Sequence, residues 1–266
     1  RLQHSNGYLD FRHSDARGTS HLQWQSWRPE AEPRAAILLV HGLGEHSGRY
    51  AHVAQACNER GFAVYAVDHY GHGKSDGQPG FVERFSVYLD GVRALLDHLR
   101  EKEPEVPVFL LGHSMGGLIA AAFLCTGQAG IHAAVLSGPA FRTDDEPSAL
   151  LRWLIRLVSR LAPTAPMIGL DPAGVSRDPE VVKAYVGDPL VHHGKLSARL
   201  LAEMMAAMRD TLERAESIEL PILVLHGEAD RLTSPQGSVL FCDRIASRDK
   251  TLKTDRGVVS RGLVSA

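Results

Sequence analysis

The sequence has few cysteines, no excess of either charge and no long apolar run, and each shortage excludes a class of protein. Its three cysteines, Cys57, Cys125 and Cys242, are odd in number and fall in helix-like stretches, which favours reduced core thiols over a disulfide framework. Lysine and arginine (29) nearly balance aspartate and glutamate (31), so no basic field would attract nucleic acid. No run reaches the roughly 18 apolar residues of a membrane helix, and the N-terminus lacks an apolar signal core. We therefore expect a soluble, cytoplasmic protein with no nucleic-acid partner.

The length and composition suit one large α/β domain with an insertion. The chain has 266 residues, of which 44% are hydrophobic and 23% charged, enough to bury a sizeable core. Two unrelated domains are not indicated.

The stretch that carries chemistry is PVFLLGHSMGGLIAAAF, residues 107–123. An apolar strand pattern changes there into a small-residue helix pattern at Gly112-His113-Ser114-Met115-Gly116, which is the G-x-S-x-G nucleophile elbow in its expected context. A serine on a tight strand-to-helix turn needs neighbours without bulk, and it gains from the helix N-terminus when negative charge develops. The alternative is an ordinary glycine-rich turn with an inert serine.

Two further motifs follow apolar strand patterns: HGLGEHSGRY at residues 41–50 and DHYGHGKS at residues 68–75. With the elbow, they make the chain resemble the α/β-hydrolase family, in its monoacylglycerol lipase and lysophospholipase-like branch. The resemblance runs from about Gly7 to Lys253. It implies an α/β-hydrolase fold: a mostly parallel, doubly wound sheet formed by residues 1–140 and 196–266, with a helical cap insertion at residues 141–195.

The resemblance also implies roles for single residues. The backbone N–H groups of Leu43 and Met115 would form an oxyanion hole, where preorganised donors stabilise a tetrahedral intermediate. Asp230, in the loop after the strand predicted at residues 221–225, would orient the catalytic histidine. Glu45 and Arg49 would lie at the polar end of the pocket near a glycerol head, or would instead form a local ion pair that fixes the loop. No cofactor or metal is implied.

Within the cap, no strand is predicted, and residues 150–161 form a strongly amphipathic helix. Its apolar stripe includes Leu154 and Leu157. We expect this face to close over the core and line an acyl pocket, so that both leucines bind substrate. The alternative is transient contact with a membrane surface, with arginines at the headgroups. Apolar residues of the helix predicted from Leu200, several of them methionines, are assigned to core packing.

The pattern fails at the base, because no histidine follows Asp230. The fold requires the order Ser, Asp, His, and the resemblance places the base at the position of Ser260. One hypothesis is that the tail is a frame-shifted reading, since codons for residues 258–263 read one base later are compatible with Leu-Tyr-His-Glu-Val-Leu. The alternative is a real loss of the base.

The sequence therefore predicts a serine carboxylester hydrolase acting on a small lipid ester, monoacylglycerol-like or lysophospholipid-like, with activity impaired by the missing histidine. Two rivals remain. One is an aminopeptidase of the same superfamily, which would need an anionic recess for the substrate ammonium. The other is a non-catalytic lipid-binding protein of the same fold.

Overall fold

The computed structural model describes residues 3–13, 18–144, 146–170, 178–230 and 232–255. Its centre is an eight-stranded sheet in the order β1-β2-β4-β3-β5-β6-β9-β10. The strands are β1 (Gln3–Phe11), β2 (Ser20–Arg28), β3 (Ala35–Val40), β4 (Phe62–Val67), β5 (Val108–His113), β6 (Ala133–Ser137), β9 (Ile222–Gly227) and β10 (Lys250–Asp255). The strands from β4 to β10 pair in parallel, and β2 pairs antiparallel with both β1 and β4. The mostly parallel sheet implied by the resemblance is thus confirmed.

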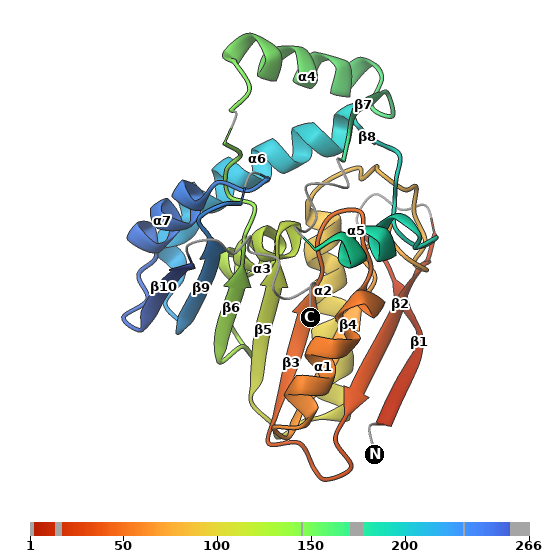
Figure 1. Cartoon of the computed structure of the whole chain (residues 1–266), viewed down its shortest axis with the longest axis vertical. Helices are drawn as coiled ribbons and strands as arrows, with labels where there is room; N and C mark the ends of the chain where they lie inside the picture. The colour runs from red at the N-terminus through yellow and green to blue at the C-terminus, as the bar shows by residue number, and fades with distance from the viewer. Residues whose placement is uncertain (1–2, 14–17, 145, 171–177, 231, 256–266) are drawn as a thin grey trace.

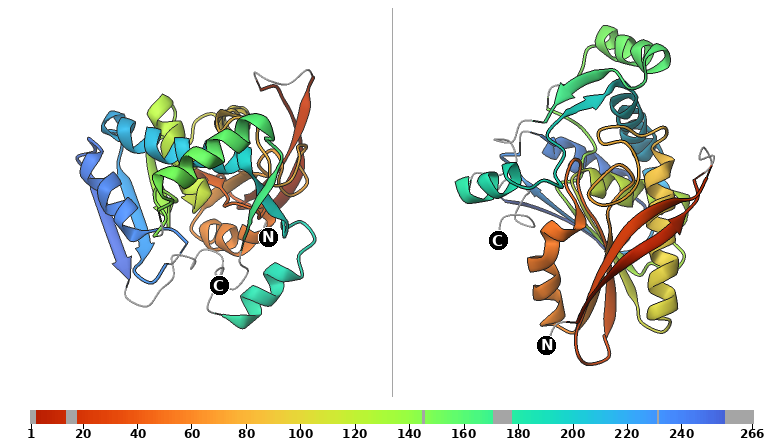
Figure 2. Two further views of the ribbon diagram at one scale, coloured as in Figure 1. Left: turned by 90° about the horizontal axis from the view of Figure 1, so that it is seen from above. Right: turned by 90° about the vertical axis from the view of Figure 1, so that its right-hand side faces the viewer.

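Helices cover both faces of the sheet (Figures 1 and 2). They are α1 (Ala51–Asn58), α2 (Ser86–Lys102), α3 (Met115–Thr126), α6 (Ala198–Arg214) and α7 (Pro235–Arg244), with short 3-10 turns at Ser47–Tyr50 and Ala215–Ser217. The alternation of strand side chains separates two cores. Leu38 and Tyr65 point into the large core shared with α2 and α3, whereas Leu39 and Val64 point into a smaller core with α1.

The smaller core leaves part of the central sheet lightly covered. In Figure 1, α1 stands in front of β3 and β4, while β5, β6 and β9 face the viewer without a helix before them. Within the described part of the chain, Phe109, Val135 and Leu223 are only half-buried on this face. The sheet is therefore sealed more completely on the α2–α3 side.

A separate layer lies above the carboxyl ends of the parallel strands (Figure 1). It contains α4 (Ala149–Leu161), β7 (Pro166–Gly169) and α5 (Pro179–Val186), and β8 (Lys195–Ser197) pairs with β7 in a small antiparallel sheet. The expectation that the insertion holds no strand is wrong. β7 escapes the sequence pattern because it has four residues, three of them exposed, and finds its partner almost thirty residues later.

Candidate active site

Ser114 lies in the turn between β5 and α3, and its backbone is strained. With φ of 54° and ψ of −119°, it is the only non-glycine residue with a positive φ in the described part of the chain. Such strain persists only where the surroundings hold it. The Ser114 N–H donates to the carbonyl of Ser137 at 2.9 Å, and its own carbonyl accepts from the N–H of Ala140 at 3.0 Å. The serine is thereby fixed, half-buried, at the N-terminus of α3.

The glycines around Ser114 occupy positions where main-chain segments lie too close together for a side chain. A Cβ on Gly116 would lie 2.0 Å from the carbonyl oxygen of Val40, and one on Gly112 would lie 2.4 Å from the carbonyl oxygen of Gly116. A Cβ on Gly117 would lie 2.8 Å from Cβ of Pro139. No side chain fits at these distances, so the motif reports the close approach of β3, β5 and α3.

The loop after β3 runs directly beside Ser114. A Cβ on Gly42 would meet Cβ of Ser114 at 3.4 Å, so the Gly42–Leu43 backbone borders the hydroxyl-bearing carbon. Met115 is the first residue of α3 and is fully buried, and its N–H has no intrahelical acceptor at that position. The Gly42–Leu43 backbone and Met115 are thus both neighbours of Ser114, and the oxyanion hole formed by the N–H groups of Leu43 and Met115 stays a prediction.

Glu45 holds this loop in shape. Its Oε1 accepts hydrogen bonds from the N–H of Gly42 at 2.7 Å and from the hydroxyl of Tyr50 at 2.5 Å. Arg49 Nε lies 3.5 Å from Oε2 of Glu45, and the guanidinium sits 5.1 Å from the ring centre of Tyr185. The arrangement is that of the local ion pair. Contact of Glu45 and Arg49 with a glycerol head stays a prediction.

Two backbone hydrogen bonds join the upper layer to the core loops. The N–H of His192 donates to the carbonyl of Gly44 at 2.7 Å, and the N–H of Ser197 donates to the carbonyl of Gly80 at 2.9 Å. Gly44 and Gly80 both have positive φ, of 75° and 71°. The segment after α5 is therefore pinned to the loop that carries Leu43.

A side-chain contact reinforces the first of these attachments. His46 Nε2 lies 2.8 Å from Oδ2 of Asp188. Burial opposes ionisation of Asp188, but the hydrogen bonds from His46 and from the Leu190 N–H outweigh it and lower the pKa of this carboxyl. Asp188 is therefore ionised at neutral pH and tethers the upper layer to the same loop.

Asp230 lies in the loop after β9, and both oxygens of its carboxylate accept hydrogen bonds. Oδ1 accepts from the N–H groups of Leu232 at 2.9 Å and Thr233 at 3.1 Å, and Oδ2 accepts from the Thr233 hydroxyl at 3.0 Å. Its side chain is buried. Because β9, β6 and β5 are adjacent parallel strands, Asp230 stands at the same edge of the sheet as Ser114.

The strand β10 ends beside that loop. Asp255 pairs with Gly227, and the Glu228 N–H donates to the Asp255 carbonyl at 3.1 Å. The chain that follows Asp255 therefore starts at the edge that bears Asp230. Ser260, at the position predicted for the base, lies outside the described residues.

Three buried histidines, His41, His69 and His72, pack against one another. Burial lowers the pKa of His41 and of His69 well below the ordinary value, and lowers that of His72. The ring of His41 is held by the Gly42 carbonyl and the His69 N–H. His226 is likewise occupied, by the Ser238 hydroxyl at 2.7 Å and the Thr233 carbonyl at 3.0 Å. These rings serve the fold.

A cleft of about 760 Å³ begins at Leu43 and runs between α4, α6 and α7. One wall is the apolar face of α6, formed by Leu201, Met204, Met205, Met208 and Leu212. Assigning this face to core packing was incomplete, since Met204 and Met208 pack on the core and also line the cleft. Nothing in the sequence alone separates these two roles, because both need an apolar stripe.

Comparison with known proteins decides the family. The model of the family described as serine aminopeptidase S33 (Hydrolase_4) matches residues 31–259. The chain belongs to this family of α/β-hydrolases.

Similar members of the family are named lipases. The monoacylglycerol lipase of Mycolicibacterium smegmatis is 41% identical over 241 residues, covering 91% of this chain and 86% of that protein. Human monoglyceride lipase is 33% identical over 258 residues, covering 97% and 85%. The crystal structure of Paleococcus ferrophilus monoacylglycerol lipase is 32% identical with a TM-score of 0.79, covering 98% of this chain and 90% of that one. The class of enzyme expected from the sequence, a carboxylic ester hydrolase, is the class these names describe.

In this hydrolase, α4 is turned opposite to the sequence-based expectation. Leu154 and Leu157 are 43% and 36% exposed and do not line the cleft, so the prediction that this face closes over the core is wrong here. The inward positions are Arg152, Ile155 and Arg156. Amphipathicity fixes the two faces of a helix but not which one meets the core. Among the described residues, no other element covers the outward apolar face of α4.

No helix in the described parts of the hydrolase has the length and apolar character needed to span a bilayer.

Proposed function

We propose that this hydrolase is a serine carboxylester hydrolase that cleaves single-chain lipid esters, monoacylglycerol-like or lysophospholipid-like, to a fatty acid and an alcohol. The observations that carry the proposal are the strained Ser114 beside the Gly42–Leu43 backbone and a largely apolar cleft that has Leu43 in its lining. The cleft volume suits an acyl chain, and the names of the relatives agree with this substrate class.

In the proposed mechanism, the Ser114 hydroxyl attacks the acyl carbon and loses its proton to a histidine. The N–H groups of Leu43 and Met115 stabilise the oxyanion, a contribution that is roughly 10²- to 10³-fold per donor in comparable sites. The alcohol leaves, and water hydrolyses the acyl-enzyme. Asp230, preset by Thr233, orients the histidine. The resemblance places that base in the segment after β10, which begins at this end of the sheet, at the position of Ser260; the sequence has no histidine after Asp230, so this chain lacks the base that the full mechanism requires.

The cleft argues against an aminopeptidase. An N-terminal ammonium needs an unpaired carboxylate, but both acidic residues among the described lining are paired. Glu146 binds Arg142 at 2.7 Å, and Glu213 lies 3.8 Å from Arg209. The lining carries more arginines than acids.

Labelling and turnover together test the proposal. A fluorophosphonate should label Ser114, and p-nitrophenyl esters of fatty acids should be hydrolysed, slowly if the base is missing. Labelling without any ester turnover would favour a non-catalytic lipid-binding protein. No labelling and no turnover would reject Ser114 as the nucleophile.

A second proposal concerns the outward face of α4, which we propose contacts lipid surfaces. Trp153 is 57% exposed and Leu161 77% exposed, and large apolar patches of this kind mark interaction sites. Sedimentation with phosphatidylcholine–phosphatidylglycerol vesicles tests it. The double variant Leu154→Asp, Leu157→Asp should stay in the supernatant where the parent sediments, and equal sedimentation would reject the contact.

A further inference from the structure

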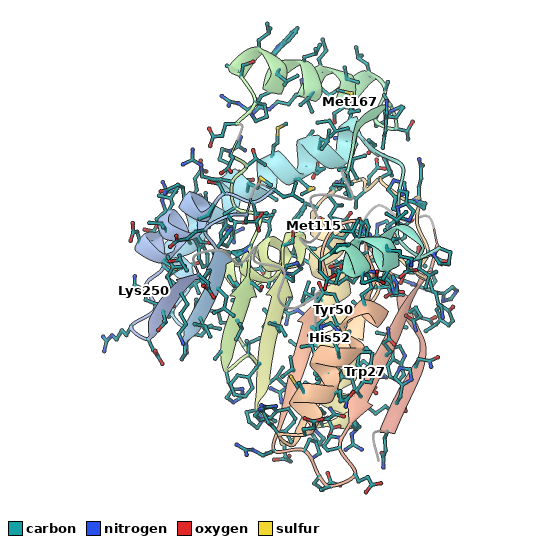
Figure 3. The ribbon with its side chains drawn as sticks, viewed as in Figure 1. Trp27, Tyr50, His52, Met115, Met167 and Lys250 are labelled. Atoms are coloured by element: carbon teal, nitrogen blue, oxygen red, sulfur yellow. The ribbon has the colours of Figure 1, made fainter. Side chains whose placement is uncertain are left out.

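The wall of the cleft formed by α4 is polar. Ile155 and Ser159 are its buried residues, and Arg152 and Arg156 flank Ile155 on the cleft side. In Figure 1, α4 lies above α6, and Figure 3 draws the side chains of both helices. Residues of both helices line the cleft. A ligand in the cleft would thus meet guanidinium groups on one side and thioethers on the other.

The charges of the lining do not cancel. Its described residues include five arginines, Arg142, Arg152, Arg156, Arg209 and Arg244, and two acids, Glu146 and Glu213. Glu146 pairs with Arg142, and Glu213 pairs with Arg209. Three guanidinium groups therefore have no carboxylate partner among the described residues.

These three arginines differ in how firmly they are held. Arg152 donates to the carbonyl of Pro147 at 2.7 Å, and Arg244 donates to the carbonyl of Leu212 at 3.0 Å. Each keeps further N–H donors for a ligand. Arg156 has neither a hydrogen bond nor an ion pair in the described structure and is exposed at the cleft. Of the three arginines, Arg156 has the most N–H donors available to a ligand.

We propose that the cleft binds single-chain amphiphiles with an anionic end, with the tail on Met204, Met205 and Met208 and the anion on Arg156, assisted by Arg152 and Arg244. Guanidinium groups bind carboxylates and phosphates in bidentate pairs, and flexible methionines adapt to a chain of any shape. Such a site would retain a free fatty acid, or select esters with an acidic group. It goes beyond the proposed hydrolysis, since binding requires neither Ser114 nor a base.

Equilibrium binding to a Ser114→Ala protein tests the proposal without turnover. Laurate, dodecyl phosphate and the neutral 1-dodecanol are compared by displacement of a fluorescent fatty acid, below micelle-forming concentrations. Arg156→Gln should weaken binding of at least one anion by roughly threefold to tenfold, because the pair is charged but partly exposed, and should leave dodecanol unchanged. Whichever of laurate and dodecyl phosphate is more affected identifies the preferred anion.

The matched control is Arg160→Gln, which removes the same charge from the same helix outside the cleft lining. The proposal predicts that this variant binds like the parent, and that Arg156→Lys keeps part of the affinity. Equal losses in the Arg156→Gln and Arg160→Gln variants would overturn it, as would dodecanol binding as tightly as both anions. Fluorophosphonate labelling is measured on protein that keeps Ser114 and does not depend on these binding results. The binding proposal and the proposed hydrolysis can therefore fail separately.

Discussion

At the scale of single residues, the strained serine and its glycines form one unit. A backbone outlier such as Ser114 costs about 1–3 kcal/mol and needs neighbours that over-determine it. Here those neighbours include the main-chain atoms of Ser137 and Ala140, which hydrogen-bond the N–H and the carbonyl of Ser114. Substitutions at this point should therefore separate chemistry from folding.

Replacing Ser114 with Ala should abolish fluorophosphonate labelling and ester hydrolysis while leaving the melting temperature nearly unchanged, because only the hydroxyl is removed. Ser217→Ala, far along the chain after α6, is the control and should retain both activities. Hydrolysis by Ser114→Ala at the parental rate would contradict the assignment.

Replacing Gly116 with Ala should instead affect folding. The new Cβ would lie 2.0 Å from the Val40 carbonyl oxygen, so β3 and α3 must separate. We expect a loss of about 3 kcal/mol or more in the free energy of unfolding, measured in urea. Gly169→Ala, where nothing lies within 4 Å, should change it by less than about 0.5 kcal/mol.

Stability should fall in mild acid because of the buried histidines. The pKa values of His41 and His69 are lowered well below 6.5 in the folded chain, so the folded state stays neutral where the unfolded state binds protons. Above pH 6.5 neither histidine affects stability. Below it, each lowers the free energy of unfolding by up to about 1.4 kcal/mol per pH unit. Urea unfolding at about pH 7.5 and about pH 5.5 measures this, and equal values would contradict it.

At the scale of elements, the sequence predicts what depends on local pattern. The elbow is identifiable because its glycines and flanking apolar runs are contiguous. The strand predicted at residues 221–225 and the helix predicted at residues 150–161 were likewise located to within a few residues, as β9 and α4. The orientation of α4 and the pairing of β7 with β8 depend on contacts between distant segments, which no local pattern encodes.

The corrected orientation changes which residues should set chain-length preference. Met205→Trp adds bulk to the cleft and should reduce hydrolysis of laurate esters roughly tenfold relative to acetate esters, since a shortened cleft excludes long chains. Met167→Trp, in β7 outside the cleft lining (Figure 3), is the control. Equal losses on both esters for Met205→Trp would show that the acyl chain lies elsewhere.

At the scale of the whole molecule, the site is divided between well-separated parts of the chain. Ser114, Leu43 and Asp230 come from three loops along one edge, and the segment after Asp255 starts at that same edge. The residues that tie this edge to the upper layer, such as His192 and Asp188, carried no signal in the sequence because their partners are distant. The position predicted for the base, that of Ser260, lies outside the described residues, and the sequence has no histidine there.

As written, the chain should hydrolyse esters weakly, with about 10³- to 10⁴-fold acceleration over water from binding and the oxyanion hole. Added imidazole should raise the rate by supplying a base, and should have no effect on Ser114→Ala. Reading the coding DNA around codon 254 tests the frame-shift hypothesis. The frame-shift hypothesis is rejected if no shifted reading frame of this DNA encodes a histidine near position 260. Strong activity without imidazole would show that another residue acts as the base.

The way in which the upper layer is attached limits where the sequence of this protein can vary during evolution. Two of its links to the core are main-chain hydrogen bonds to Gly44 and Gly80, and any residue except proline can supply the N–H that His192 and Ser197 donate. On the core side the positions admit little variation, because Gly44 and Gly80 have positive φ, of 75° and 71°, which favours glycine. Apart from residues such as Asp188 that bind the core through their side chains, the layer can therefore change its side chains, and with them its ligands, while it stays attached above Ser114. New specificities can arise there without disturbing the elbow.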